Sequence, residues 1–187
     1  IRASPVVYGY SQSLSAAYGF LVGCIFCYGA KVGWYHSIFL PGILLEMESG
    51  EMSTWGSVDE CTLVLVSAGI CAANTLTSGD ALPKRALRIN LTCGDFIEVA
   101  YPYMSKSKTV NIAGYLASGV STAILYSKQP SNVMSSAYLP MPLSLILADD
   151  WSRLGLAMMS AFIIAFGGML CSNMMKPRNY EQKKKGN

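Results

Sequence analysis

The sequence predicts an all-α membrane protein with four transmembrane helices and short interfacial amphipathic segments. Only 13% of the 187 residues are charged and 52% are hydrophobic, whereas soluble domains carry about 25% charged residues. Four apolar runs are long enough to cross a bilayer, because roughly 20 helical residues span its hydrocarbon core. Most of the 14 Lys and Arg residues fall in connections on one predicted side of these runs.

The runs define one polytopic membrane domain covering residues 1–187. The predicted spans are residues 14–32, 61–79, 109–127 and 154–175, and a polar tail occupies residues 176–187. The second and third runs contain no charged residue, as expected of segments in hydrocarbon, where a charge costs about 3 kcal/mol.

The first apolar region, Leu14–Leu45, is longer than one span. One interpretation is a span that ends near Lys31, followed by an interfacial or re-entrant segment, Ser37–Leu45. The alternative is a single long helix kinked at Pro41. Aromatic rings favour the first interpretation, because Trp and Tyr prefer the membrane–water interface. The predicted boundary residues are Lys31, Trp34, Tyr35 and Trp151.

The sequence predicts a specific structure for three of the connections between the spans. Glu46–Glu60 holds five acidic residues and no base, which indicates a solvated loop. Within the basic connection, Cys93–Tyr101 has the spacing of a short amphipathic helix that Pro102 would end. Tyr138–Ala148 is apolar but too short to cross.

Charge predicts the orientation. Four spans place both termini on one side, together with the basic connection and the basic tail. The positive-inside rule assigns that side to the cytoplasm, matrix or stroma.

Small residues recur at helix-packing spacing. Close backbone approach over Gly and Ala supplies the van der Waals gain between helices in lipid. The predicted packing residues are Gly19, Gly23, Gly29, Gly33, Ala113, Ala117, Ala157 and Ala161. Their partners are helices of this chain or of other subunits.

Candidate chemistry is sparse. His36 is the single histidine, and it is a weak candidate for cofactor binding because usual metal sites need further ligands. Lys31 is interpreted as a boundary residue whose stem reaches the interface. Lys183, Lys184 and Lys185 are candidates for lipid-headgroup contact. No catalytic or metal motif is present, so we expect no enzyme, no intrinsic cofactor and no nucleic-acid partner; pigment and haem remain minor alternatives.

These features favour an accessory, structural subunit of a large complex in an energy-converting organelle membrane, either the mitochondrial inner membrane or the thylakoid. Its expected partners are other membrane subunits and structural lipids. The alternatives are a small oligomeric transporter or channel, with Lys31, Asn74, Asn111 and Asn173 along its route, and a subunit that holds a cofactor or pigment.

Overall fold

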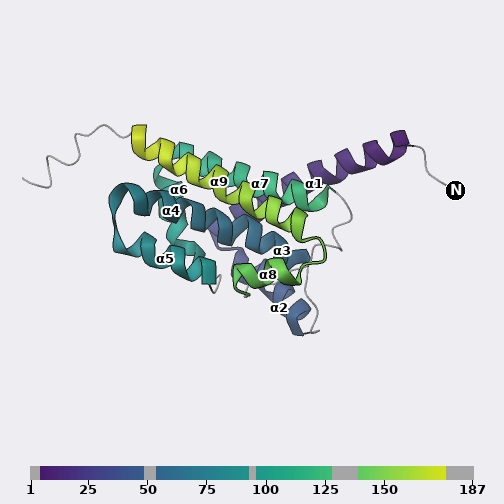
Figure 1. Cartoon of the computed structure of the whole chain (residues 1–187), viewed down its shortest axis with the longest axis horizontal. Coiled ribbons are helices and arrows are strands. Elements are labelled where there is room, and N and C mark those ends of the chain that lie inside the picture. The colour runs from purple at the N-terminus through teal and green to yellow at the C-terminus, as the bar shows by residue number, and fades with distance from the viewer. Residues whose placement is uncertain (1–4, 49–53, 93–95, 128–138, 176–187) are drawn as a thin grey trace, which may run out of the picture.

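The computed structural model describes residues 5–48, 54–92, 96–127 and 139–175, and every regular element in these ranges is helical (Figure 1). The predicted all-α class is therefore confirmed for this part of the chain. The elements are α1 (Pro5–Val32), η1 (Tyr35–Phe39), α2 (Leu40–Glu48), α3 (Thr54–Asp59), η2 (Glu60–Val64), α4 (Leu65–Ser78), α5 (Ala81–Thr92), η3 (Ile97–Ala100), α6 (Tyr101–Lys106), α7 (Lys108–Tyr126), α8 (Met141–Leu147) and α9 (Trp151–Met175).

Three helical stretches of the described chain are long and apolar enough to cross a membrane: Leu14–Val32, Thr54–Ser78 and Trp151–Met175. They contain or overlap three of the four predicted spans. The third predicted span coincides with α7, a helix of 19 residues, but its Asn, Ser and Thr side chains make it less apolar than the other three. Four spans are thus not shown by length and composition.

The second stretch begins earlier than predicted. Thr54–Ser78 is continuous helix through α3, η2 and α4, so the expectation of a solvated acidic loop up to Glu60 is wrong for its last residues. Asp59 and Glu60 are each only 2% exposed. The acidic residues were interpreted as a loop because the sequence alone does not show the interior contacts that accommodate buried carboxylates.

The first apolar region is two segments. Helix α1 ends at Val32, and Gly33 adopts φ 95°, a conformation open mainly to glycine. Pro41 lies inside the continuous helical stretch that η1 and α2 form together, so the first apolar region breaks at Gly33 and not at Pro41. Phe39 of η1 stacks on Phe26 at 4.1 Å between ring centroids, so η1 folds back along α1.

The connection between α4 and α7 differs from its predicted form. Gly79 closes α4 with φ 69° and its N–H donates to Thr75 O, a common helix end. The following helix is α5, N-terminal to the predicted Cys93–Tyr101. Pro102 does not end a helix but lies in the first turn of α6, which tolerates proline.

Helices α1 and α7 are antiparallel. Near one end of the pair, Ser15 Oγ donates to Tyr126 O at 2.6 Å. Near the other, Lys31 Nζ donates to Asn111 Oδ1 at 2.7 Å. These two bonds align the start of α1 with the end of α7.

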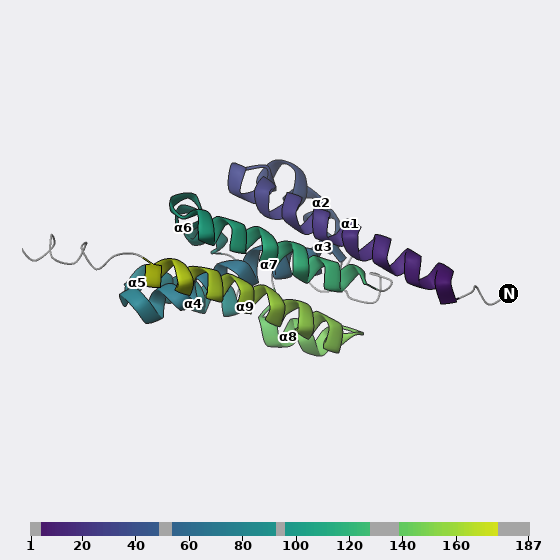
Figure 2. The same cartoon turned by 90° about the horizontal axis from the view of Figure 1, so that it is seen from above.

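Helices α7 and α9 are also antiparallel. The Ser107 and Ser172 hydroxyls lie 2.8 Å apart, and Arg153 Nη1 donates to Leu125 O at 3.2 Å. Seen from above, α1, α7 and α9 lie side by side in one layer (Figure 2).

Helix α4 packs beneath this layer and parallel to α9. A Cβ on Gly69 would lie 2.6 Å from Phe162 O, and Asn173 Nδ2 donates to Thr77 Oγ1 at 2.7 Å. Helix α5 then packs against α4 on the side away from α9 (Figure 1). The order of levels is therefore the α1–α7–α9 layer, then α4, then α5.

These directions place the start of α1 and the end of α9 at opposite ends of the bundle (Figure 1). We call the end where α1, α4 and α9 finish the basic end, because Lys106, the last residue of α6, and Lys108, the first residue of α7, lie there. The predicted placement of both termini on one side is not supported, since α1 and α4 run in the same direction. The chain therefore returns between them, and η1 and α2 begin that return.

Candidate functional site

Glycines hold α1 against α7. A Cβ on Gly19 would lie 2.7 Å from Thr122 O. A Cβ on Gly23 would overlap Ser118 O and the Thr122 hydroxyl. The two predicted packing glycines thus allow backbone contact inside this chain.

Alanines hold the rest of the layer together. Ala113 contacts Gly168 so closely that a Cβ on Gly168 would overlap the Ala113 side chain. Ala117, Ala157 and Ala161 are fully buried. The predicted alanines are therefore interior residues of the α7–α9 part of the bundle.

The two remaining predicted glycines differ from each other. A Cβ on Gly29 would lie 2.8 Å from the Phe39 ring, so Gly29 admits the returning segment η1. Gly33 has no atom within 4 Å of a Cβ position. Gly33 was expected to pack helices, but its role is the positive-φ turn after α1.

A cavity of about 300 Å³ opens where α1 ends. It lies between this end, the start of η1, and the segment η3–α6. Its lining includes Lys31, Val32, Tyr35, His36, Glu98 and Tyr101. It brings both nitrogen bases of the first apolar region together with a carboxylate that the sequence did not connect to them. We call it the polar cavity.

Lys31 points into the bundle rather than only toward the interface. Its ammonium donates to Asn111 Oδ1 at 2.7 Å and lies 5.9 Å from the centroid of the Tyr115 ring. The ammonium has three N–H donors, so these contacts leave it able to donate a hydrogen bond to a group in the polar cavity.

Tyr35 links the polar cavity to a buried carboxylate. It was predicted as an interfacial ring, but it is only 9% exposed. Its hydroxyl donates to Asp59 Oδ2 at 3.4 Å, and its ring meets His36 edge to face. His36 itself is exposed.

Tyr101 contributes a neutral phenol to the cavity. Burial raises the pKa of Tyr101 well above its ordinary value, and Cys27, Glu98 and Asp59 raise it further. The phenol therefore stays protonated and can donate a hydrogen bond.

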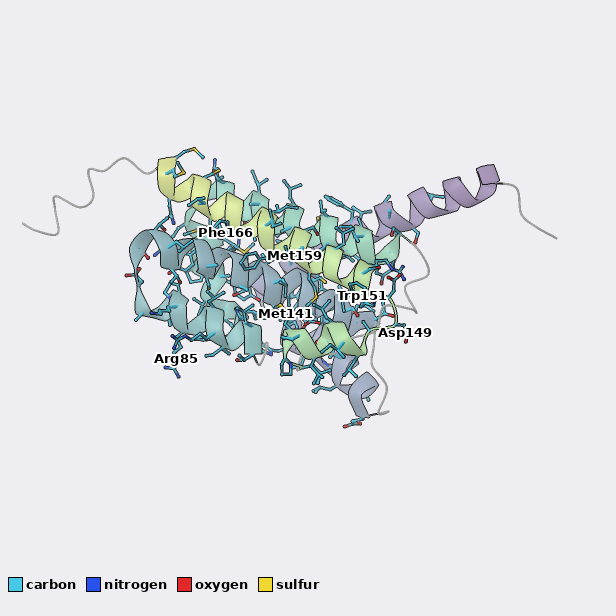
Figure 3. The ribbon with its side chains drawn as sticks, in the orientation of Figure 1. Arg85, Met141, Asp149, Trp151, Met159 and Phe166 are labelled. Atoms are coloured by element: carbon cyan, nitrogen blue, oxygen red, sulfur yellow. The ribbon has the colours of Figure 1, made fainter. Side chains whose placement is uncertain are left out.

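A second charged group lies at the opposite end of the bundle. Arg153 is 7% exposed and its Nε lies 3.1 Å from Asp150 Oδ2. Asp150 also accepts a hydrogen bond from the Arg153 backbone at 3.1 Å, so it caps the start of α9. Asp149 and Trp151 are exposed beside it (Figure 3). The Asp149-Asp150 pair is thus part of a helix start.

The polar residues considered for a transport route form separate pairs. Lys31 pairs with Asn111, and Asn173 Nδ2 lies 3.5 Å from Asn74 Oδ1.

Cys24 Sγ faces Tyr115 O at 3.5 Å, and Cys27 is 1% exposed, as packing cysteines are. Trp34 and Trp151 are exposed at 48% and 68%. Lys183, Lys184 and Lys185 lie outside the described residues.

Helix α5 carries a charged outer face alongside a candidate span. Asn90 Nδ2 donates to Ser67 Oγ at 2.9 Å, and Ala86 packs beside Cys71, so α5 runs back along the middle of the Thr54–Ser78 stretch. Its exposed basic residues are Lys84, Arg85 and Arg88. Arg88 lies level with about Ile70, roughly 12 Å inside the end of α4 at 1.5 Å per residue. Arg85 points away from the bundle (Figure 3).

Comparison with known protein families, curated proteins and solved structures finds no match. Within the described residues, no group of three or more His, Cys, Asp or Glu side chains is placed to hold a metal ion.

Proposed function

We propose that this chain is an integral membrane subunit of a larger complex and that the basic face of α5 meets a partner subunit. The charged face of α5 carries the proposal. A Lys or Arg facing hydrocarbon near the bilayer centre costs about 3 kcal/mol. Arg85 and Arg88 are exposed beside α4, which is a candidate span. A polar or acidic protein surface against α5 would keep these side chains out of hydrocarbon and offer them hydrogen-bond acceptors.

The opposite face of the bundle suits lipid. The α1–α7–α9 layer exposes apolar side chains from all three helices, including Ile25 and Tyr28 of α1, Ile112 and Leu116 of α7, and Met159 and Ile163 of α9. The two faces together describe a subunit at the edge of an assembly, with lipid on one side and protein on the other.

The orientation follows from the bundle and the charges. Helices α1 and α9 flank α7 throughout its length, so we propose that α7 crosses as well and that η1–α2 begins the segment that carries the chain back across before α3. The basic end then lies in the matrix, stroma or cytoplasm. The start of α1 lies on the other side. An energy-converting organelle membrane remains the proposed location, and the proposed role is structural rather than enzymatic.

Native electrophoresis of gently solubilised membranes, followed by mass spectrometry, tests this proposal. We expect the chain in a band well above its own 20.2 kDa, accompanied by other membrane subunits. Migration of the chain alone would overturn the proposal.

A second candidate is transport, favoured by the contact from Tyr35 to the buried Asp59. A buried acid in a candidate span is a functional hypothesis by default. Flux of protons or small cations into proteoliposomes should then fall in Asp59→Asn and persist in Glu48→Gln, an exposed acid of α2. Equal flux in both variants would remove Asp59 from any route.

A further inference from the structure

We infer that the polar cavity binds the headgroup of a phospholipid with a primary amine, of the phosphatidylethanolamine type. This inference rests on the proposed placement in a membrane but not on assembly with other subunits. Cavity size, charge and position each support it.

The charges in the cavity match a zwitterion. Lys31 and His36 offer N–H donors for a phosphate, and Glu98 offers a carboxylate for an ammonium group. One lysine and one histidine against one carboxylate leave little net positive charge. The cavity therefore suits a neutral headgroup better than an anionic one, which would favour several cations without an acid.

Glu98 selects the amine. It is exposed, lies on η3 and lines the cavity, so it can accept a hydrogen bond from a primary ammonium. The trimethylammonium group of a choline lipid has no N–H to donate. The Tyr101 phenol, kept neutral by burial, adds a donor for a phosphate or glycerol-ester oxygen.

The position of the cavity suits a lipid. It opens where a candidate span ends, at the expected depth of headgroups. Val32 lines the cavity and also continues an exposed apolar stripe along α1 that includes Leu21, Ile25 and Tyr28. Residues spaced by three and four share one helix face. Acyl chains can therefore follow this stripe from a headgroup held in the cavity. The volume of about 300 Å³ lies at the lower end of small-ligand sites.

Lipid titration of the purified protein tests the inference. Delipidated protein in detergent micelles is titrated with dioleoyl phosphatidylethanolamine and, separately, with dioleoyl phosphatidylcholine. Native mass spectrometry measures lipid occupancy and Tm measures stability. We expect the ethanolamine lipid to bind about tenfold more tightly, the effect of one charge-assisted hydrogen bond. Equal binding of the two lipids would overturn the inference.

Two exposed residues separate the contributions of amine and phosphate. Glu98→Gln should sharply reduce the preference for ethanolamine, because a neutral amide oxygen accepts a weaker hydrogen bond from the ammonium than a carboxylate does. His36→Ala should weaken both lipids alike, because both carry the phosphate. Glu48→Gln, outside the cavity, should behave as wild type. Retention of the ethanolamine preference in Glu98→Gln would contradict the assignment.

A soluble ligand with the same chemistry is distinguished directly. Free glycerophosphoethanolamine should raise Tm far less than the whole lipid, because it lacks acyl chains for the α1 stripe. An equal rise in Tm would assign the site to a soluble phosphoester and overturn the inference of a lipid site. This experiment uses the isolated chain, so its outcome is independent of whether the chain assembles with other subunits.

Discussion

Single glycines set how closely the helices approach. At Gly23 the neighbouring atoms belong to the α7 backbone and to Thr122, and the backbone cannot rotate away. Sequence spacing identified Gly19 and Gly23 as packing residues but not their partner. The partner depends on the direction of α7, which no local pattern encodes.

Gly23→Ala should destabilise the protein by about 2 kcal/mol, because the new methyl overpacks the α1–α7 contact. The matched control is Gly167→Ala in α9, where a Cβ meets nothing within 4 Å. The control should change stability by less than about 1 kcal/mol. Equilibrium unfolding in detergent micelles measures both. Equal effects of the two substitutions would contradict the packing role of Gly23.

The Lys31–Asn111 hydrogen bond couples α1 to α7. A double-mutant cycle of Lys31→Met and Asn111→Leu should give a coupling free energy of about 0.6 kcal/mol, typical of interhelical hydrogen bonds in membrane proteins. Additive effects of the two substitutions would show that Lys31 only reaches the interface, as its sequence position alone suggests.

At the scale of elements, long apolar runs were sufficient to locate Leu14–Val32 and Trp151–Met175 within a few residues. The same reasoning failed at Thr54–Glu60, because buried acids such as Asp59 are accommodated by contacts from distant elements. It failed at Pro102, because proline at a first helical turn looks in sequence like proline at a helix end. The polar cavity was also not predictable, since Glu98 reaches Lys31 and His36 only through tertiary packing.

The turn at Gly33 separates α1 from the returning segment. Gly33→Ala should cost about 1–2 kcal/mol, because φ 95° is strained for a residue with a Cβ. Gly42→Ala is the control: Gly42 lies inside α2 without positive φ or near neighbours, so alanine there should be neutral or stabilising. Unfolding free energies of both variants check this. A neutral Gly33→Ala would mean that the chain does not turn at this residue.

At the scale of the whole molecule, the structure differs from four spans of alternating direction, because α1 and α4 run in the same direction. Tags on the two termini should lie on opposite sides of the membrane, because α1 starts and α9 finishes at opposite ends of the bundle. Protease protection of each tag in sealed vesicles measures this. Both tags on one side would restore simple alternation and contradict the parallel placement of α1 and α9.

The proposed function rests on the difference between the two faces of the bundle. The apolar α1–α7–α9 layer suits lipid, whereas the proposal gives the basic face of α5 a protein partner because charged side chains are costly in hydrocarbon. Composition predicted a membrane protein. It did not predict the face that we propose for a partner, because α5 has the sequence of an ordinary basic connection and only its packing on α4 places its charges beside a candidate span.

The most direct test is native electrophoresis with mass spectrometry on wild type, on Arg85→Glu with Arg88→Glu, and on the control Lys106→Glu, an exposed lysine at the basic end. We expect wild type and the control to migrate with other membrane subunits, and the double variant to be released from them while its Tm in micelles stays unchanged. Migration of the wild-type chain alone, or a double variant that keeps all its partners, would contradict assembly through the basic face of α5.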